Sequence, residues 1–137
     1  MSLARRVEEL LRPGGPLAGR WPGYEDRPGQ RDLARDVAAT FERGGVLLAE
    51  APTGIGKSVA YLLPALLTIL STNRRVVGAT CTKSLQDQLF ERDLPVLLEA
   101  LGEPVPCARL KGKQNYVCGH ALETAEGDGP DKRAVLD

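Results

Sequence analysis

The sequence predicts an α/β fold in which a parallel sheet is flanked by helices. Residues 46–49 form a short, continuous apolar run that is typical of a strand buried on both faces, residues 76–79 look like a second buried strand, and residues 105–110 look like a third strand. Longer segments with apolar residues at helical spacing alternate with these runs. The resulting order of strand, loop, helix, strand, helix and strand is that of a parallel sheet with helices packed on it.

The expected helices follow from the apolar spacing and from the residues that end each segment. The segment at 57–71 is apolar nearly all round, so we expect it to be deeply buried, with Pro64 bending its axis. Thr82 or Ser84 can cap a later helix, and Gly44 and Gly102 are expected to end two others. The predicted helices lie at residues 2–12, 28–43, 57–71, 82–92 and 94–101, with a weaker one at 115–126.

Composition limits the class of protein. The chain has 137 residues, of which 42% are apolar and 26% charged, as in a globular domain rather than a disordered chain. Eighteen basic residues balance eighteen acidic ones, so contact with nucleic acid has to be local. The uncharged run at 59–73 is too short to span a bilayer and the first residues lack a signal-peptide core, so we expect a cytoplasmic protein without a membrane partner.

Residues 51–58 have the spacing of a phosphate-binding loop. Gly54 and Gly56 allow backbone N–H groups to close around phosphate oxygens, and the start of the next helix points its positive end at the same anion. Lys57 can reach the β- and γ-phosphates, and Ser58 can offer its hydroxyl to Mg²⁺. The alternative, a glycine turn before a core helix, does not require this lysine and serine. The predicted nucleotide-binding residues of the loop are Ala51, Pro52, Thr53, Gly54, Ile55, Gly56, Lys57 and Ser58, the last two also being catalytic candidates.

The loop by itself does not identify the reaction, because phosphate loops occur in several classes of enzyme. The segments beside the loop reduce the number of possible classes. Residues 24–30 resemble the Q motif of superfamily-two helicases, which implies that Gln30 reads the adenine edge, with Arg27 beside it. Residues 50–66 resemble motif I of the DinG and XPD branch of that superfamily. Pro64 is part of this resemblance, whereas Ile55 departs from the small hydroxyl residue that is common there. Trp21 and Tyr24 either form a packing pair or flank the adenine.

Residues 79–89 resemble motif Ia of the same branch, a turn that touches the backbone of single-stranded DNA. The resemblance implies that Thr80, Thr82 and Lys83 contact DNA phosphates. The alternative is that Thr82 only caps a helix and Lys83 is a solvated charge.

Residues 108–118 resemble the entry to the iron–sulfur insertion of DinG- and XPD-type helicases. The resemblance implies that Cys118 is the first of four thiolate ligands of a [4Fe–4S] cluster and that Lys111 and Lys113 meet DNA phosphates. No cysteine follows Cys118 in this sequence, so the cluster is expected only in a longer protein. A zinc site at Cys107, Cys118 and His120 would lack paired spacing and a fourth ligand.

Taken together, the resemblance implies the first part of an incomplete RecA-like motor domain. It implies an ATP-dependent DNA helicase of the DinG type, using ATP and Mg²⁺ for 5′-to-3′ unwinding in DNA repair. Residues 1–22 are then an N-terminal helix and linker, 23–118 the ATP-binding part, and 119–137 the start of the iron–sulfur insertion. Because no Asp-Glu-Ala-His run is present, the chain is expected to be truncated and inert by itself, with an unpaired sheet edge.

Two other functions stay open. The chain could be a nucleotide-binding regulator that never hydrolyses ATP, or a phosphate-loop kinase, although the acceptor site and lid of a kinase are not recognisable. The sequence leaves the DNA structure and the oligomeric state undetermined.

Overall fold

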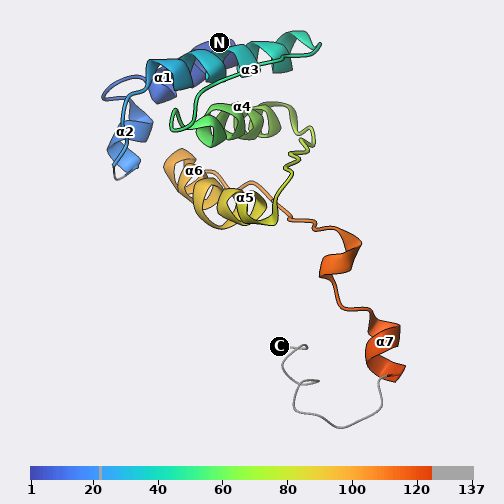
Figure 1. Cartoon of the computed structure of the whole chain (residues 1–137). Coiled ribbons are helices and arrows are strands. Elements are labelled where there is room, and N and C mark those ends of the chain that lie inside the picture. The colour runs from blue at the N-terminus through green and yellow to red at the C-terminus, as the bar shows by residue number, and fades with distance from the viewer. Residues whose placement is uncertain (22, 125–137) are drawn as a thin grey trace. The chain divides into compact units, whose positions relative to one another are not determined.

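The computed structural model describes residues 1–21 and 23–124, which belong to two compact units, Met1–Cys107 and Ala108–Asp137. The described part of the second unit holds the short 3₁₀ helix η2 (Lys113–Asn115) and α7 (Gly119–Thr124). The first unit is built from α1 (Leu3–Leu11), α2 (Pro16–Arg20), α3 (Pro28–Arg43), α4 (Lys57–Thr72), α5 (Lys83–Gln88), the π-helical turn η1 (Leu89–Asp93) and α6 (Leu94–Leu101) (Figure 1).

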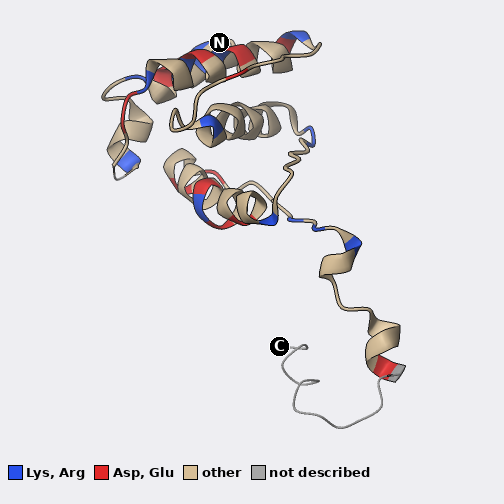
Figure 2. Cartoon of the chain, in the orientation of Figure 1, with Lys and Arg blue, Asp and Glu red and all other residues tan. Residues whose placement is uncertain are grey.

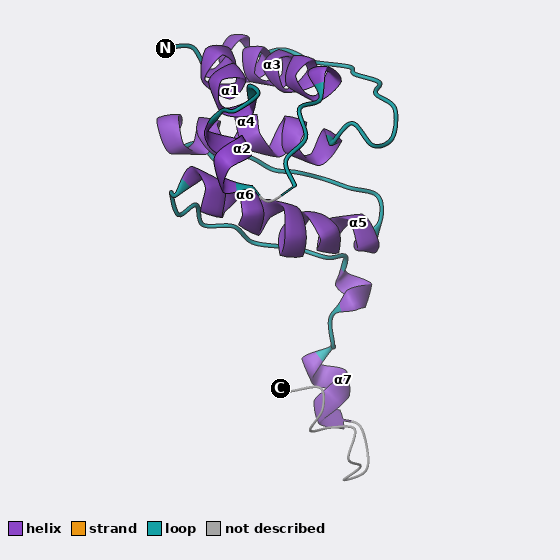
Figure 3. Ribbon diagram, turned by 90° about the vertical axis from the view of Figure 1, so that its left-hand side faces the viewer, coloured by secondary structure: helices purple, strands orange, loops and turns teal. Residues whose placement is uncertain are grey.

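The first unit is layered around α4. Helices α1 and α3 lie side by side, α4 follows them, and α5, η1 and α6 lie on its other side (Figures 1 and 3). Lys57 is the only charged residue of α4, so the helix is uncharged beyond its first residue (Figure 2). Leu63 and Leu67 of α4 are fully buried, and so is Pro64. The prediction that this helix is buried is therefore confirmed.

Local sequence explains where the helices begin and end. The hydroxyl of Ser2 accepts a hydrogen bond from the N–H of Arg5 at 3.2 Å and caps α1. Pro28 occupies the first turn of α3, where its missing N–H costs nothing. Gly44 and Gly102 end α3 and α6 with positive φ angles of 75° and 69°, as predicted.

The predicted helices in the first unit are confirmed, with two differences. Residues 13–29 were predicted to be irregular, but α2 (Pro16–Arg20) is helical. The helices predicted at 82–92 and 94–101 form one continuous helical rod, because the backbone stays right-handed helical through η1. Of the weak helix predicted at 115–126, residues 119–124 are helical, and residues 125 and 126 lie outside the described residues.

The prediction of a parallel sheet flanked by helices is wrong for this structure. Residues 46–49, 76–79 and 105–110 form no strand, and no strand occurs anywhere in the part of the chain that is described (Figure 3). The first two segments connect helices of different layers, α3 to α4 and α4 to α5. The prediction of an unpaired sheet edge is therefore also wrong for the described residues, because they contain no sheet.

The exposure of these segments gives the physical reason. Val46, Leu48 and Val77 are 89%, 92% and 91% exposed, although their apolar character predicted burial on both faces. An apolar run becomes a strand only when a neighbouring strand takes up its N–H and C=O groups, and periodicity carries no information about that neighbour. Helix-on-helix contacts instead bury the apolar faces of this unit.

No helix in the described ranges is both long enough and apolar enough to cross a membrane.

Candidate functional site

The glycine loop lies directly before α4, and its two glycines adopt backbone conformations that other residues rarely take. Gly54 has φ +87° and Gly56, which precedes the first residue of α4, has φ +80°. A Cβ atom added to Gly56 would lie 2.0 Å from Nε2 of Gln30. Glycine is therefore needed in this loop for two reasons: it adopts the positive φ angles, and at Gly56 it leaves room for the side chain of Gln30.

Lys57 is the first residue of α4, and its ammonium group bends back over the loop. Its Nζ donates to the carbonyl oxygen of Ala51 at 2.6 Å and to that of Pro52 at 3.1 Å. The side chain is exposed, so it is free to move away from the loop. A bound anion would have to replace these two carbonyl oxygens as partners of the ammonium group.

Gln30 lies in the first turn of α3 and is only 4% exposed. Its Nε2 donates to the carbonyl oxygen of Gly56 at 3.0 Å, which ties α3 to the glycine loop. Arg27, the residue before α3, places Nη1 3.6 Å from the position of a Cβ on Gly56 and pairs with Glu25 at 2.7 Å. Gln30 and Gly56, which are 26 positions apart in sequence, are therefore in direct contact.

These residues share one pocket of about 150 Å³. It brings Arg27 and Gln30 together with Gly56 and Ser58, four of the residues for which the sequence analysis predicts nucleotide binding. Residues 51–55 and Lys57 do not line it, although Lys57 contacts Ala51 and Pro52. The pocket is lined by Trp21, Gly23, Tyr24, Glu25, Arg27, Gln30, Gly56, Ser58, Val59, Gln88, Arg92 and Asp93.

Trp21 and Tyr24 line the pocket and also pack against the core, so both alternatives for this pair remain compatible with the geometry. Their rings are tilted by 51° with centroids 6.4 Å apart. The Tyr24 hydroxyl donates to the carbonyl oxygen of Leu11. Burial, followed by the charge of Asp26, raises the pKa of Tyr24, while Arg31 opposes the rise.

Sequence reasoning missed Gln88, Arg92 and Asp93 as pocket residues. They come from α5 and η1, on the far side of α4 from α3. Gln88 lies in the segment that resembles motif Ia, but no nucleotide role was predicted for it, and Arg92 and Asp93 follow that segment and belong to no motif. The one signal was the predicted helix at 82–92, but its orientation relative to α4 depends on tertiary packing.

The predicted DNA-contact residues Thr80, Thr82 and Lys83 lie at the start of α5. The hydroxyl of Thr82 accepts from the N–H of Leu85 at 3.2 Å, so the helix cap that was the alternative interpretation is present. Oγ1 of Thr80 is buried and has no hydrogen-bond partner in the structure. Lys83 is exposed and has an interaction partner within the protein.

In the second unit, Lys111, Lys113 and Cys118 lie in or beside short helical turns. The N–H of Lys111 donates to the Tyr116 hydroxyl at 2.8 Å, and Lys113 begins η2. Cys118 is exposed, and its carbonyl oxygen accepts from the N–H of Leu122 at 2.9 Å. No group of three or more potential metal ligands gathers within residues 1–21 and 23–124. The residues present therefore do not fit an iron–sulfur cluster.

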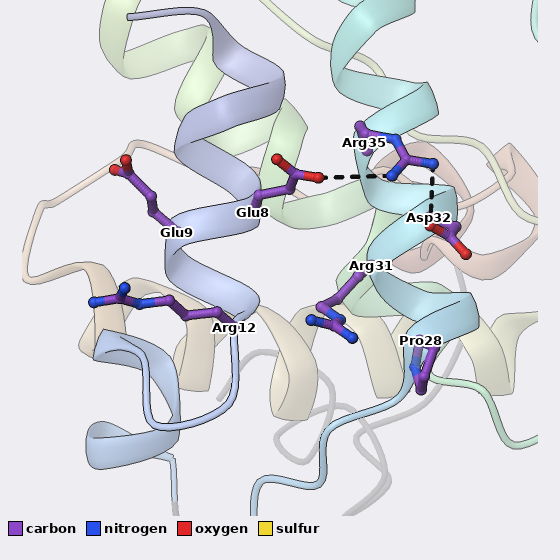
Figure 4. A pocket seen from close by; sticks show the side chains of 7 residues that line it. All are labelled: Glu8, Glu9, Arg12, Pro28, Arg31, Asp32 and Arg35. Atoms are coloured by element: carbon purple, nitrogen blue, oxygen red, sulfur yellow. Dashed lines mark ion pairs between the residues drawn. The ribbon is translucent and has the colours of Figure 1, made fainter.

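A larger hollow of about 360 Å³ lies between α1 and α3, away from the glycine loop (Figure 4). Three of its charges pair within the wall, because Arg35 lies 3.6 Å from Glu8 and 3.0 Å from Asp32. None of the predicted site residues lines it. We assign no ligand to this hollow, which is lined by Glu8, Glu9, Arg12, Pro28, Arg31, Asp32 and Arg35.

A glycine loop whose lysine and serine begin a buried helix has the residue order of the phosphate-loop nucleotide-binding class, although residues 46–49 before the loop form no strand. The sequence profile described as DEAD/DEAH box helicase matches residues 28–115. This chain belongs to the DEAD/DEAH box helicase family.

Relatives narrow the family to one branch. The chain is 46% identical over 138 residues to the ATP-dependent helicase DinG of Mycobacterium tuberculosis (strain ATCC 25618 / H37Rv), covering 96% of this chain and 20% of that protein. It is 44% identical over 121 residues to the ATP-dependent DNA helicase YoaA of Escherichia coli (strain K12), covering 86% and 18%. The 3′-5′ exonuclease DinG of Bacillus subtilis (strain 168) is 40% identical over 102 residues, covering 74% and 11%. The resemblance to DinG-type helicases that the sequence indicated is thereby confirmed.

The chain spans about one fifth or less of the length of these curated relatives. No solved structure gives a significant match to it.

Proposed function

We propose that this chain is an ATP-binding part of an ATP-dependent DNA helicase of the DinG type, a cytoplasmic protein that couples ATP hydrolysis to 5′-to-3′ unwinding. The observation that carries the proposal is the shared pocket of Arg27, Gln30, Gly56 and Ser58. It joins a buried carboxamide, which suits a base edge, to a glycine loop, which suits a phosphate chain. The family and its DinG and YoaA relatives support the same function.

The proposed roles divide the nucleotide between two elements. Gln30 and Arg27, at the start of α3, recognise the adenine. Lys57 neutralises the phosphates and Ser58 supplies a hydroxyl ligand for Mg²⁺, which screens the charge that develops in hydrolysis. The residues proposed to hold ATP are Arg27, Gln30, Ala51, Pro52, Thr53, Gly54, Ile55, Gly56, Lys57 and Ser58.

Three hydrogen bonds of the ligand-free chain bear on this proposal. Lys57 donates to two carbonyl oxygens and Gln30 donates to one. Exchanging a neutral carbonyl for a phosphate oxygen strengthens each bond of the lysine, because the acceptor then carries a negative charge that attracts the ammonium group. The loop therefore has donors that are satisfied without ligand and gain free energy when a phosphate replaces the carbonyl groups.

We further propose that single-stranded DNA contacts the turn that precedes α5. The buried hydroxyl of Thr80, which lacks a partner, supports a ligand at this turn. Thr82 caps α5, so its backbone rather than its occupied hydroxyl is the expected contact. Lys83 would add a phosphate contact at this turn. Lys111 and Lys113 are proposed to contact DNA phosphates from the second unit, and each such contact increases the salt dependence of binding.

The proposal assigns no step to an iron–sulfur cluster, because Cys118 has no companion ligands among the described residues. It also assigns no turnover to the 137-residue chain by itself. Hydrolysis requires a carboxylate pair that holds Mg²⁺ and orients water, and an arginine finger. The sequence contains no Asp-Glu-Ala-His run.

Binding of a fluorescent ATP analogue to the chain, followed by anisotropy with Mg²⁺ present, tests the nucleotide site. We expect Lys57→Ala to weaken binding at least tenfold, because a charge-assisted contact contributes about 1.5–3 kcal/mol. Arg75→Ala, which removes an exposed cation outside the pocket, is the matched control. Equal affinities for the chain and for Lys57→Ala would refute the site.

Competition with unlabelled GTP tests the role of Gln30. We expect Gln30→Ala to reduce the preference for ATP over GTP, since the carboxamide is the proposed reader of the base. An unchanged preference would remove Gln30 from that role while leaving the phosphate loop in place.

A further inference from the structure

A buried carboxylate lies in the wall of the nucleotide pocket that comes from η1. Asp93 is the last residue of this π-helical turn and is only 7% exposed. It lines the same pocket as Gln30 and Ser58. π-helical turns are rare, and they occur frequently at functional sites. Because a buried charge is costly without partners, the groups around Asp93 indicate what it binds.

The partners of Asp93 within the protein use only part of its capacity for hydrogen bonds. Nε2 of Gln88 donates to Oδ2 at 3.3 Å, and Nε of Arg92 lies 3.5 Å from Oδ1. Both distances are longer than the roughly 2.7–3.2 Å of a usual N–H···O hydrogen bond. An ionised carboxylate has about four lone-pair sites and no donor. A ligand in the pocket that offers O–H or N–H donors would therefore find an acceptor at Asp93.

The size and the charge of the pocket indicate which part of a nucleotide it holds. Its volume of about 150 Å³ is below the roughly 300–1,000 Å³ of sites that enclose a whole small molecule. Two arginines of its wall, Arg27 and Arg92, are balanced by two carboxylates, Glu25 and Asp93. Lys57, the proposed partner of the phosphates, does not line it. The pocket therefore suits the uncharged nucleoside part, with the phosphates continuing along the glycine loop.

Among the groups of a nucleoside, the ribose hydroxyls fit Asp93. Phosphate oxygens are acceptors, and a carboxylate repels their negative charge. The amino group of adenine is a donor, but it is the proposed partner of Gln30. The ribose hydroxyls are the remaining donors, and carboxylates also bind ribose hydroxyls in dinucleotide-binding folds.

The other carboxylate of the pocket fits this role less well. Glu25 is exposed, and its Oε2 already accepts a hydrogen bond from Arg27 at 2.7 Å. Asp93 is buried, and both of its partners are longer than 3.2 Å. Asp93 is therefore the carboxylate with more acceptor capacity left for a ligand.

We propose that Asp93 binds the ribose hydroxyls of the nucleotide, so that the pocket distinguishes ribonucleotides from deoxyribonucleotides. The inference rests on the proposed function, because it takes Gln30 as the reader of the base and the glycine loop as the phosphate site. It goes further in adding a specificity-determining residue on η1, to which neither the phosphate loop nor the Q motif assigns a role. Gln88 and Arg92 position the carboxylate.

Calorimetric titration with ATP and with 2′,3′-dideoxy-ATP, both with excess Mg²⁺, tests the inference. The two ligands share the base and the triphosphate, so the ratio of their affinities reports the hydroxyls alone. We expect the unaltered chain to bind ATP about ten- to hundredfold more tightly, the size of a hydrogen bond to a charged group. Asp93→Ala should bring the ratio to within about twofold of one by weakening ATP, while its affinity for dideoxy-ATP stays that of the unaltered chain.

Two further variants make the result specific. Asp93→Asn keeps the shape and a neutral acceptor, so its ratio should fall between those of Asp93→Ala and the unaltered chain. It also preserves the test if circular dichroism shows that Asp93→Ala does not fold. Glu99→Gln removes an exposed carboxylate of α6 that does not line the pocket, and it should leave the ratio unchanged.

The contrary outcomes are distinct. A ratio near one in the unaltered chain would overturn the inference, while ATP binding itself would keep the proposed function. A high ratio that persists in Asp93→Ala would assign the sugar to another residue and overturn the inference as well. Equal losses for ATP and dideoxy-ATP would also overturn it, since they would show a role in the fold or at the phosphates. Absence of ATP binding to the unaltered chain would refute the proposed function and the inference together.

Discussion

Substitution of Gly56 by alanine probes the contact that joins α3 to the glycine loop. Two costs combine at this position. Alanine at φ +80° costs about 1–2 kcal/mol because its Cβ crowds the carbonyl oxygen in the left-handed region. The new Cβ would also lie 2.0 Å from Nε2 of Gln30, which must then leave the carbonyl oxygen of Gly56. A buried donor without a partner costs about 1–3 kcal/mol more.

Two other glycines separate these costs. Gly54 has φ +87° with nothing within 4 Å of an added Cβ, so Gly54→Ala should show the backbone cost alone. Gly29 lies in the first turn of α3 with open space around it and no positive φ, so Gly29→Ala should be neutral or stabilising by up to about 1 kcal/mol. We therefore expect Gly29→Ala to have the highest unfolding free energy of the three variants, Gly54→Ala an intermediate one and Gly56→Ala the lowest.

Urea unfolding followed by circular dichroism measures these differences. We expect Gly56→Ala to lose about 3 kcal/mol, roughly twice the loss of Gly54→Ala. Removing the obstructing carboxamide in Gly56→Ala/Gln30→Ala should cost less than the sum of the two single substitutions. If Gly56→Ala were no less stable than Gly54→Ala, the close approach of Gln30 to the loop would be refuted.

Three further predictions concern the core, a helix cap and the tyrosines. Leu63→Ala should lower the unfolding free energy by about 2–5 kcal/mol because Leu63 is fully buried, whereas Leu110→Ala, at an 81% exposed position, should change it by about 0.5 kcal/mol or less in urea titrations. Thr82→Ala should cost about 1 kcal/mol of unfolding free energy through loss of the α5 cap, and a helical content equal to that of the unaltered chain would argue against the cap. The folded-state pKa values of Tyr24 and Tyr61 are raised above the ordinary value of 10, so their contribution to stability is fully present below pH 10 and is lost as pH rises through the raised values. Absorbance titration should show both tyrosines ionising above pH 10, and Tyr61→Phe should remove one of the late transitions.

Much of the local structure was predictable because it depends on neighbours in sequence. The helix at 57–71 follows from its apolar composition, and its burial follows from the near absence of charge. The ends at Gly44 and Gly102 follow from the freedom of glycine at positive φ. The spacing of the phosphate loop and the resemblance to DinG-type helicases were likewise available from the residues, and the family match confirms that resemblance.

The sheet was the main error, and its cause is specific. Val46, Leu48 and Val77 have the composition of buried strands, but pairing depends on a partner strand that local sequence does not specify. In the described structure these residues are exposed connections between helices. Composition predicts a preference for burial, whereas the available neighbours decide whether the preference is met.

For the nucleotide pocket, too, some features were predictable from the sequence and others depend on tertiary structure. The sequence by itself determined the chemical groups, a carboxamide at Gln30 and a lysine and serine at the helix start, because motifs specify residue types and spacing. Tertiary structure alone decided that Gln30 donates to Gly56 and that Asp93 lines the same pocket as Ser58. Contacts between residues more than 25 positions apart depend on how helices pack, and helix packing is a property of whole faces rather than of any short segment.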